Sequence, residues 1–83
     1  MKVHIKYFAS IREAAGVPGE TLDVNVQTLA QLRDLLIARG TALSTALTRG
    51  RALRMALNQV MAEESMPLVD GCEVAFFPPV TGG

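Results

Sequence analysis

Residues 28–40, TLAQLRDLLIARG, contain the strongest helix signal in the chain. Thr28 stands three residues before Gln31, which is the spacing of a capping box, and Gly40 suits the left-handed residue that ends a helix. Between them, apolar side chains recur at helical intervals, at Leu29, Leu32, Leu35 and Leu36. An amphipathic helix must bury its apolar stripe against another element. The sequence therefore predicts one main helix that lies on a sheet.

Short segments with period-two alternation supply that sheet. Before the main helix, residues 3–7 and 22–26 are predicted to be strands that form a hairpin. The short helix between them is predicted to begin at Ser10, three residues before Glu13, and to stop at Gly16.

After the main helix the signals are shorter. One or two helical turns are expected within residues 42–50, followed by strands at residues 53–57, 60–62 and 73–77. Strands grouped around one principal helix predict an α+β domain, with a mixed sheet packed against that helix. This is the β-grasp, or ubiquitin-like, architecture, and we expect residues 1–83 to form one such domain.

Composition narrows the class of protein. Almost half of the 83 residues are hydrophobic and the formal net charge is zero, which favours a packed domain and argues against a nucleic-acid partner. A single cysteine allows no internal disulfide and no multi-cysteine metal site, as expected in a reducing cytoplasm. No apolar run approaches the ~20 residues of a membrane span. We expect a cytoplasmic protein that does not bind a membrane, a metal ion or a cofactor.

The sequence shows no self-sufficient catalytic arrangement. His4 is the only histidine and is predicted to lie on the surface of a strand, and Cys72 is expected to be a small buried thiol. Glu63 and Glu64 are interpreted as parts of a solvated loop, and so are the arginines at 49, 51 and 54. The chain is therefore not expected to be an enzyme on its own.

The end of the chain has a different character. Pro78 and Pro79 have no N–H to donate, so the last strand must stop there, and we expect residues 78–83 to form a flexible functional tail. Gly82 and Gly83 have no side chains and could pass through a narrow channel. The terminal α-carboxylate could then be adenylated by another enzyme and opened by sulfide or an amine. A disordered end is the alternative.

Several segments resemble the small subunit of molybdopterin synthase, a ubiquitin-like sulfur carrier. The resemblance covers the whole chain and is strongest in residues 73–83, EVAFFPPVTGG, with support from Asp70-Gly71, from YFASIREAAG at 7–16 and from Leu57-Asn58-Gln59. The run FFPPVTGG is highly specific to this family. The family usually has an acidic residue where this chain has Cys72.

The resemblance implies a mechanism. An E1-like enzyme adenylates the Gly83 carboxyl with ATP, and a sulfur donor such as a cysteine desulfurase or rhodanese converts it to a thiocarboxylate. The tail then enters the large catalytic subunit of a heterotetramer, where its sulfur passes to precursor Z (cyclic pyranopterin monophosphate) in molybdenum cofactor biosynthesis.

In this scheme Gly83 carries the sulfur and Gly82 provides clearance. The remaining residues guide the tail and contribute to the partner interface: Phe77, Pro78, Pro79, Val80 and Thr81. Alternation in the last strand also predicts that Phe76 lies in the core and Phe77 on the outer face, at a partner surface.

Three other functions stay open. A sulfur carrier for another pathway, such as thiamine thiazole synthesis, shares the fold and the terminal glycines but usually lacks the segment FFPPV that precedes them. A protein modifier would form isopeptide bonds to lysines. A plain binding domain would tolerate loss of both glycines.

Overall fold

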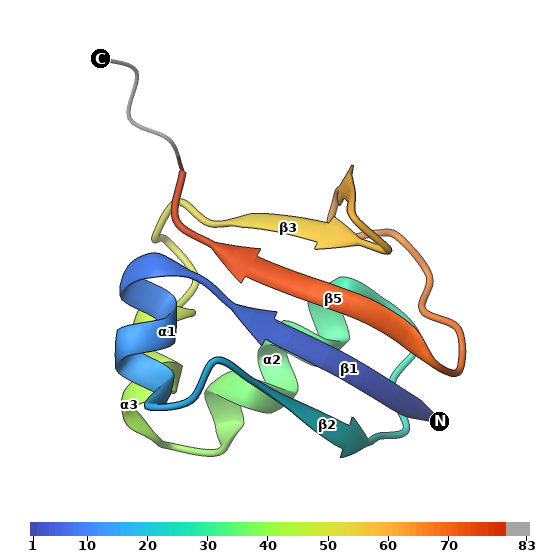
Figure 1. The fold of residues 1–83 in the computed structure, drawn as a ribbon, viewed down its shortest axis with the longest axis horizontal. Helices are drawn as coiled ribbons and strands as arrows, with labels where there is room; N and C mark the ends of the chain where they lie inside the picture. The colour runs from blue at the N-terminus through green and yellow to red at the C-terminus, as the bar shows by residue number, and fades with distance from the viewer. Residues whose placement is uncertain (80–83) are drawn as a thin grey trace.

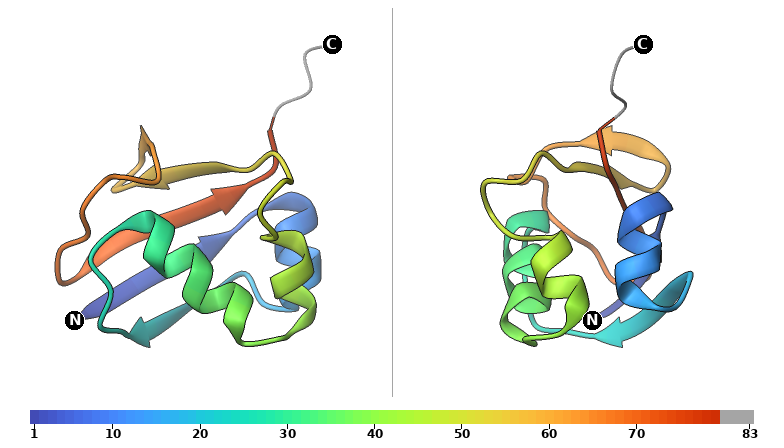
Figure 2. Two further views of the ribbon diagram at one scale, coloured as in Figure 1. Left: turned by 180° about the vertical axis from the view of Figure 1, so that it is seen from behind. Right: turned by 90° about the vertical axis from the view of Figure 1, so that its left-hand side faces the viewer.

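The protein is described here by a computed structural model that covers residues 1–79, with a five-stranded mixed sheet at its centre (Figure 1). The elements are β1 (Lys2–Tyr7), α1 (Ala9–Ala15), β2 (Gly19–Asp23), α2 (Leu29–Ala38), α3 (Ala42–Ala46), β3 (Arg54–Leu57), β4 (Val60–Ala62) and β5 (Cys72–Phe77). The strand order is β2-β1-β5-β3-β4, in which β1 and β5 run parallel and the other neighbours antiparallel. The helices lie on one face of the sheet (Figure 2). The predicted α+β architecture, a mixed sheet packed against one main helix, is confirmed.

In the hairpin of β1 and β2, the second strand lies three residues earlier in the chain than its sequence pattern suggests. Side chains of β1 alternate strictly between exposed and buried, as predicted. The second strand runs from Gly19 to Asp23, so the prediction of a strand at residues 22–26 was wrong at both ends. Asp23 lies opposite Lys2, where β1 begins. Residues 24–26 therefore lie beyond the start of β1 and belong to no strand.

The start of α1 also differs from the prediction. Ser10 is the second residue of the helix, and Phe8 occupies the N-cap position without a side-chain hydrogen bond. The Phe8 N–H still donates to the carbonyl of Phe76, while the Phe8 carbonyl accepts from the N–H of Ile11. The chain therefore turns directly from sheet to helix. At the other end, Gly16 has a φ of 78° and ends the helix as predicted.

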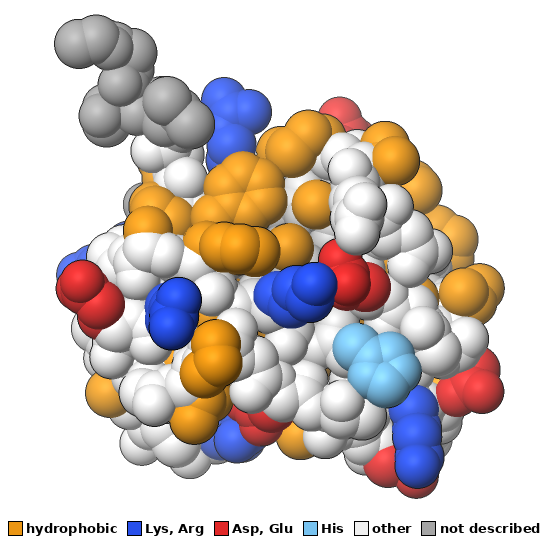
Figure 3. All heavy atoms as spheres, viewed as in Figure 1, with side chains coloured by type: hydrophobic (Ala, Val, Ile, Leu, Met, Phe, Trp, Pro, Cys, Tyr) orange, Lys and Arg blue, Asp and Glu red, His pale blue; other side chains and the backbone are white. Residues whose placement is uncertain are grey.

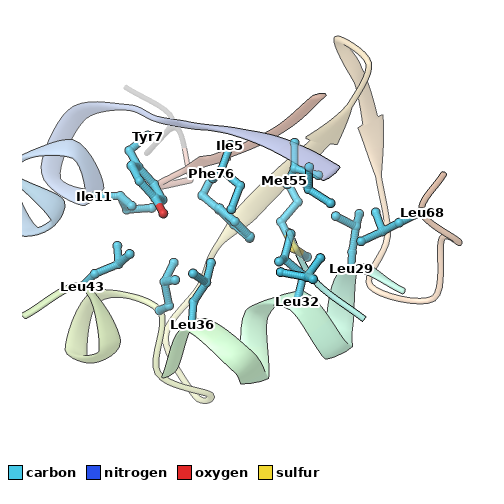
Figure 4. Close-up of a cluster of buried hydrophobic side chains, with 14 of the residues drawn as sticks. Ile5, Tyr7, Ile11, Leu29, Leu32, Leu36, Leu43, Met55, Leu68 and Phe76 are labelled. Carbon is cyan, nitrogen blue, oxygen red and sulfur yellow. The ribbon is translucent and has the colours of Figure 1, made fainter. Parts of the chain in front are cut away.

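The main helix α2 begins as its sequence predicts. The Thr28 hydroxyl accepts from the N–H of Gln31 at 3.3 Å, while the Gln31 side chain accepts from the N–H of Gln27, one residue before the cap. Gly40 follows with a φ of 66°. The apolar side chains of α2 point toward those of the sheet and form the core with them (Figure 4). Members of this core with no solvent exposure are Val3, Leu29, Leu32, Leu36, Leu47, Val74 and Phe76.

A buried charge also holds α2 in place. Arg33 is 6% exposed and its guanidinium donates to the carbonyl of Leu47 at 2.7 Å and to that of Thr48 at 3.0 Å. It also donates to Glu64 at 2.9 Å, and Arg49 binds the same carboxylate oxygen. Arg33 thus ties the segment after α3, and the loop before β5, to the middle of α2.

A tight turn joins β3 and β4. Asn58 and Gln59 both have positive φ, at 50° and 69°, which is the backbone of a two-residue hairpin turn. Asn58 exchanges two further hydrogen bonds with Glu73: its N–H donates to the Glu73 carbonyl at 2.8 Å, and its side-chain oxygen accepts from the Glu73 N–H at 2.9 Å. These two residues are the ones left between the predicted strands at 53–57 and 60–62, and the turn that they form is tied to the start of β5.

Candidate functional site

The tail leaves the fold from the central strand of the sheet. β5 is paired with β1 on one side and with β3 on the other, where Phe77 lies opposite Arg54. Pro78 and Pro79 follow directly and cannot extend either ladder, because neither has an N–H. The strand therefore stops where the sequence predicts. The predicted tail residues Val80, Thr81, Gly82 and Gly83 lie outside the described residues, so their roles stay predictions.

The two phenylalanines at the end of β5 face opposite sides, as predicted. Phe76 is fully buried and stacks on Tyr7, with 6.4 Å between ring centroids. Phe77 lies on the outer face and is partly buried, with its ring edge-on to that of Phe8 at a centroid distance of 6.3 Å. Phe8 is itself 46% exposed. The outer pair therefore presents aromatic surface beside the exit of the tail.

This aromatic pair continues into an apolar surface across the outer face of the sheet. Ala56 of β3 lies between Ala75 of β5 and Met61 of β4 in the strand register. Figure 3 shows hydrophobic side chains gathered over this part of the sheet, next to the point where the chain leaves it. We call this surface the outer patch; it consists of Phe8, Ala56, Met61, Ala75 and Phe77. Phe8 and Met61 are exposed and Phe77 is partly exposed, whereas Ala56 and Ala75 are buried. Large exposed apolar side chains gathered in this way are typical of a protein interface.

Charged side chains border the outer patch. The ammonium group of Lys6 binds the carboxylate of Glu73 at 3.1 Å on the same face of the sheet. His4 is exposed, as predicted, and its Nδ1 lies 2.9 Å from the Thr21 hydroxyl. A polar border around an apolar centre is the usual anatomy of an interface.

On the helix side, a groove between α1 and α3 reaches the root of the tail. Its lining includes Ile11, Ala46 and Leu53, together with Arg51 and Pro78. The chain therefore emerges between two different surfaces, the outer patch and this groove.

Reactive side chains do not gather at this site. Cys72 is 2% exposed and lies in the core, as predicted. The Tyr7 hydroxyl donates to Glu20 at 2.6 Å, and burial together with this hydrogen bond raises the pKa of Tyr7. Within residues 1–79, no group of three His, Cys, Asp or Glu side chains could hold a metal ion. In the same part of the chain no helix is long and apolar enough to cross a membrane.

The sequence interpretation missed two features of the structure. Glu64 was assigned to a solvated loop, but it is partly buried and binds Arg33 and Arg49, so that assignment was wrong. Phe8 was not identified as the aromatic neighbour of Phe77. Its position, one residue after a strand with a buried Tyr7, places it on the outer face and could have revealed it.

Comparison with known proteins identifies the family. A model of the ThiS family matches residues 5–83. The molybdopterin synthase sulfur carrier subunit of Escherichia coli is 38% identical over 81 residues, which cover 98% of this chain and 99% of that protein. The chain belongs to the ThiS family. Within this family it is a relative of the molybdopterin synthase sulfur carrier subunits.

Solved structures share the fold of this chain. The alignment with SAMP1 from Haloferax volcanii covers the full length of both chains, with a TM-score of 0.83 and 27% sequence identity. Subunit 1 of the molybdopterin-converting factor from Helicobacter pylori was solved in complex with subunit 2. Its alignment with this chain covers the full length of both proteins, with a TM-score of 0.65 and 27% sequence identity. These neighbours confirm the β-grasp, ubiquitin-like fold of this ThiS-family chain.

Proposed function

We propose that this chain is the sulfur carrier subunit of a molybdopterin synthase and that Gly83 carries the sulfur. The observation that supports this most strongly is the arrangement at the end of β5. A central strand, fixed on both sides, ends at two prolines beside an exposed apolar patch. In a chain whose relatives are named sulfur carrier subunits, this arrangement suits a terminus that is presented to other proteins.

The chemistry takes place at the terminal carboxyl group. An E1-like enzyme transfers the adenylyl group of ATP to the Gly83 carboxylate and releases pyrophosphate. The persulfide of a donor such as a cysteine desulfurase or rhodanese then attacks the acyl-adenylate and displaces AMP, which gives an acyl disulfide. A second thiol reduces this bond, leaves a thiocarboxylate on Gly83 and is itself oxidised to a disulfide with the donor. The chain supplies the carboxyl group and its presentation, and the adenylating enzyme supplies the activation.

The large subunit then receives the tail, and the thiocarboxylate sulfur passes to precursor Z. The outer patch is the surface by which the carrier docks, with Phe77 at the end of the patch next to the tail, while Pro78, Pro79, Val80 and Thr81 lead the terminus into the channel. Gly82 leaves room beside the reacting carbon. The catalytic acids and bases belong to the large subunit, so this chain is not an enzyme by itself.

The mass of the intact protein tests the first step. After co-expression with an E1-like enzyme and a sulfur source, we expect the mass to rise by the difference between sulfur and oxygen. A variant with one extra residue after Gly83 should stay unmodified, because the reacting carboxyl is displaced by about 3.5 Å and an amide takes its place. A variant that delivers sulfur without being trimmed back to Gly83 would contradict the proposal.

Two further variants test the fit of the tail. Deleting Gly83 shortens the reach, and Gly82→Val keeps the length but adds a β-branched side chain. Both should bind the large subunit nearly as the unaltered chain does and yet transfer little sulfur. Normal melting temperatures would show that neither change unfolds the domain.

A sulfur carrier for another pathway, such as thiamine thiazole synthesis, is the second candidate, because the matching family model is that of ThiS. The relatives named molybdopterin synthase sulfur carrier subunits favour the first candidate. Measured binding to the large subunit of molybdopterin synthase separates the two, since a carrier for thiazole synthesis should not bind it.

A further inference from the structure

Three arginines close together in the sequence, Arg49, Arg51 and Arg54, differ in whether they form ion pairs within the domain. Arg49 binds the carboxylate of Asp34 at 3.0 Å and also that of Glu64. Arg51 and Arg54 are exposed and form no ion pair within residues 1–79. Internal contacts therefore account for the charge of Arg49, while the charges of Arg51 and Arg54 face outward.

These two arginines flank the point where the tail begins. Arg54 lies opposite Phe77 in the ladder of β3 and β5, at the border of the outer patch. Arg51 lines the groove between α1 and α3 together with Pro78. One cation thus stands on the sheet side of the tail and the other on the helix side.

The backbone of both arginines is fixed. The Arg51 N–H donates to the carbonyl of Thr48 at 3.1 Å, and its own carbonyl accepts from the buried guanidinium of Arg33 at 3.4 Å. Arg54 is the first residue of β3. A partner that binds here does not have to order a loop first, and this keeps the cost of association low.

The length of the tail decides what these cations can contact. The five residues after Pro78 span roughly 17 Å when extended. That is about twice the distance over which charges are felt at physiological ionic strength, ~8 Å. When the tail is extended, small molecules that react at Gly83 are therefore out of reach of Arg51 and Arg54. The protein surface that surrounds the inserted tail is within reach.

We propose that the large subunit carries carboxylates around the entrance of the channel that receives the tail, and that Arg51 and Arg54 pair with them as the subunits associate. The identity of this partner rests on the proposed function. The acidic entrance lies next to the apolar surface that covers the outer patch, so the two contacts form one continuous interface.

Association kinetics between the full chain and the large subunit test this inference. At low ionic strength, Arg51→Gln and Arg54→Gln should each slow association about threefold to fivefold, because each removes one charge pair at contact distance in water. The difference should shrink at an ionic strength of about 0.15 M. Arg54→Lys keeps the charge and should associate at nearly the original rate.

Lys2→Gln is the matched control. Lys2 is exposed and has no ion pair within residues 1–79. It lies opposite Asp23 at the start of β1, far from Phe77. The substitution therefore removes the same charge at a distance from the tail. It should leave the association rate unchanged. Equal slowing by Lys2→Gln, or association that does not depend on salt, would overturn the inference.

Two further readouts separate this inference from the proposed function. If the unaltered chain forms a thiocarboxylate and transfers sulfur while the arginine variants associate normally, only the acidic entrance is wrong. If the unaltered chain transfers no sulfur with the large subunit, the proposed function fails whatever the salt dependence. Slowing seen only with the adenylating enzyme would also contradict the assignment to the large subunit.

Discussion

Replacement of Arg33 by methionine should destabilise the domain by about 1–3 kcal/mol. Methionine keeps most of the apolar length of the side chain, so the loss comes from the guanidinium. The Leu47 carbonyl lies in the core and would lose its donor, and such a group costs ~1–3 kcal/mol. Thr48 and Arg51 are exposed, so water can replace the donor at their carbonyls. Glu64 keeps Arg49 as a partner.

An apolar replacement of a buried ion pair can be neutral when both partners are removed. Here the partners of Arg33 include backbone carbonyls, which no substitution removes. The cost of leaving a buried carbonyl without a donor should therefore exceed any gain from removing the buried charge. For a domain of this size, each 1 kcal/mol lowers the melting temperature by roughly 4–8 °C. Urea unfolding followed by circular dichroism measures the change, and Arg39→Met is the control. Arg39 is 39% exposed, so its pair with Glu20 should contribute less than about 1 kcal/mol.

The pH dependence gives the same reasoning a second test. Partial burial raises the pKa of Glu64, but hydrogen bonds from Arg33 and Arg49 outweigh this effect and lower it below its ordinary value of 4.5. The stability from this carboxylate is therefore present above pH 4.5 and is lost as the pH falls through the lower folded value. The loss should be shallower in Arg33→Met. A variant within 1 kcal/mol of the original chain, with an unchanged acid profile, would refute this account of Arg33.

Three other substitutions separate structural from functional roles. Gly19→Ala would place a Cβ 2.4 Å from the carbonyl oxygen of Ile5, so it should cost about 1–3 kcal/mol in urea unfolding, and retained stability would show that the hairpin can move apart. Phe77→Ala should weaken binding to the large subunit by roughly 1–3 kcal/mol in calorimetry. It should lower stability by only ~0.5–1.5 kcal/mol, through the lost contact with Phe8; unchanged binding with a large loss of stability would contradict its role. Cys72→Ala should leave thiocarboxylate formation intact by intact mass, and loss of the modification in a folded variant would assign the thiol to sulfur relay.

Local sequence signals predicted the parts of the fold that depend on neighbouring residues. The cap of α2 at Thr28, the end of α1 at Gly16 and the alternation of β1 all follow from interactions within a few residues. The opposite orientations of Phe76 and Phe77 follow from strand geometry alone. These features need no knowledge of distant parts of the chain.

The errors lie where distant segments decide the outcome. The second strand ends at Asp23 because β1 begins at Lys2, and α1 begins early because Phe8 is still bonded to β5. The pairing of Glu64 with Arg33 joins residues 31 positions apart. One signal was available for Arg33, which stands four residues after Leu29 on the apolar side of α2. For the other features, the sequence holds no local trace.

The position of β5 between two neighbours also determines how the domain bears a mechanical load. A pull on the tail acts along the axis of β5, whose register includes five residue pairs with β1 and four with β3. Force in that direction shears both ladders at once, whereas a pull across an edge strand would open its bonds one after another. Withdrawal of the terminus from a tight channel therefore strains the part of the sheet that resists tension best.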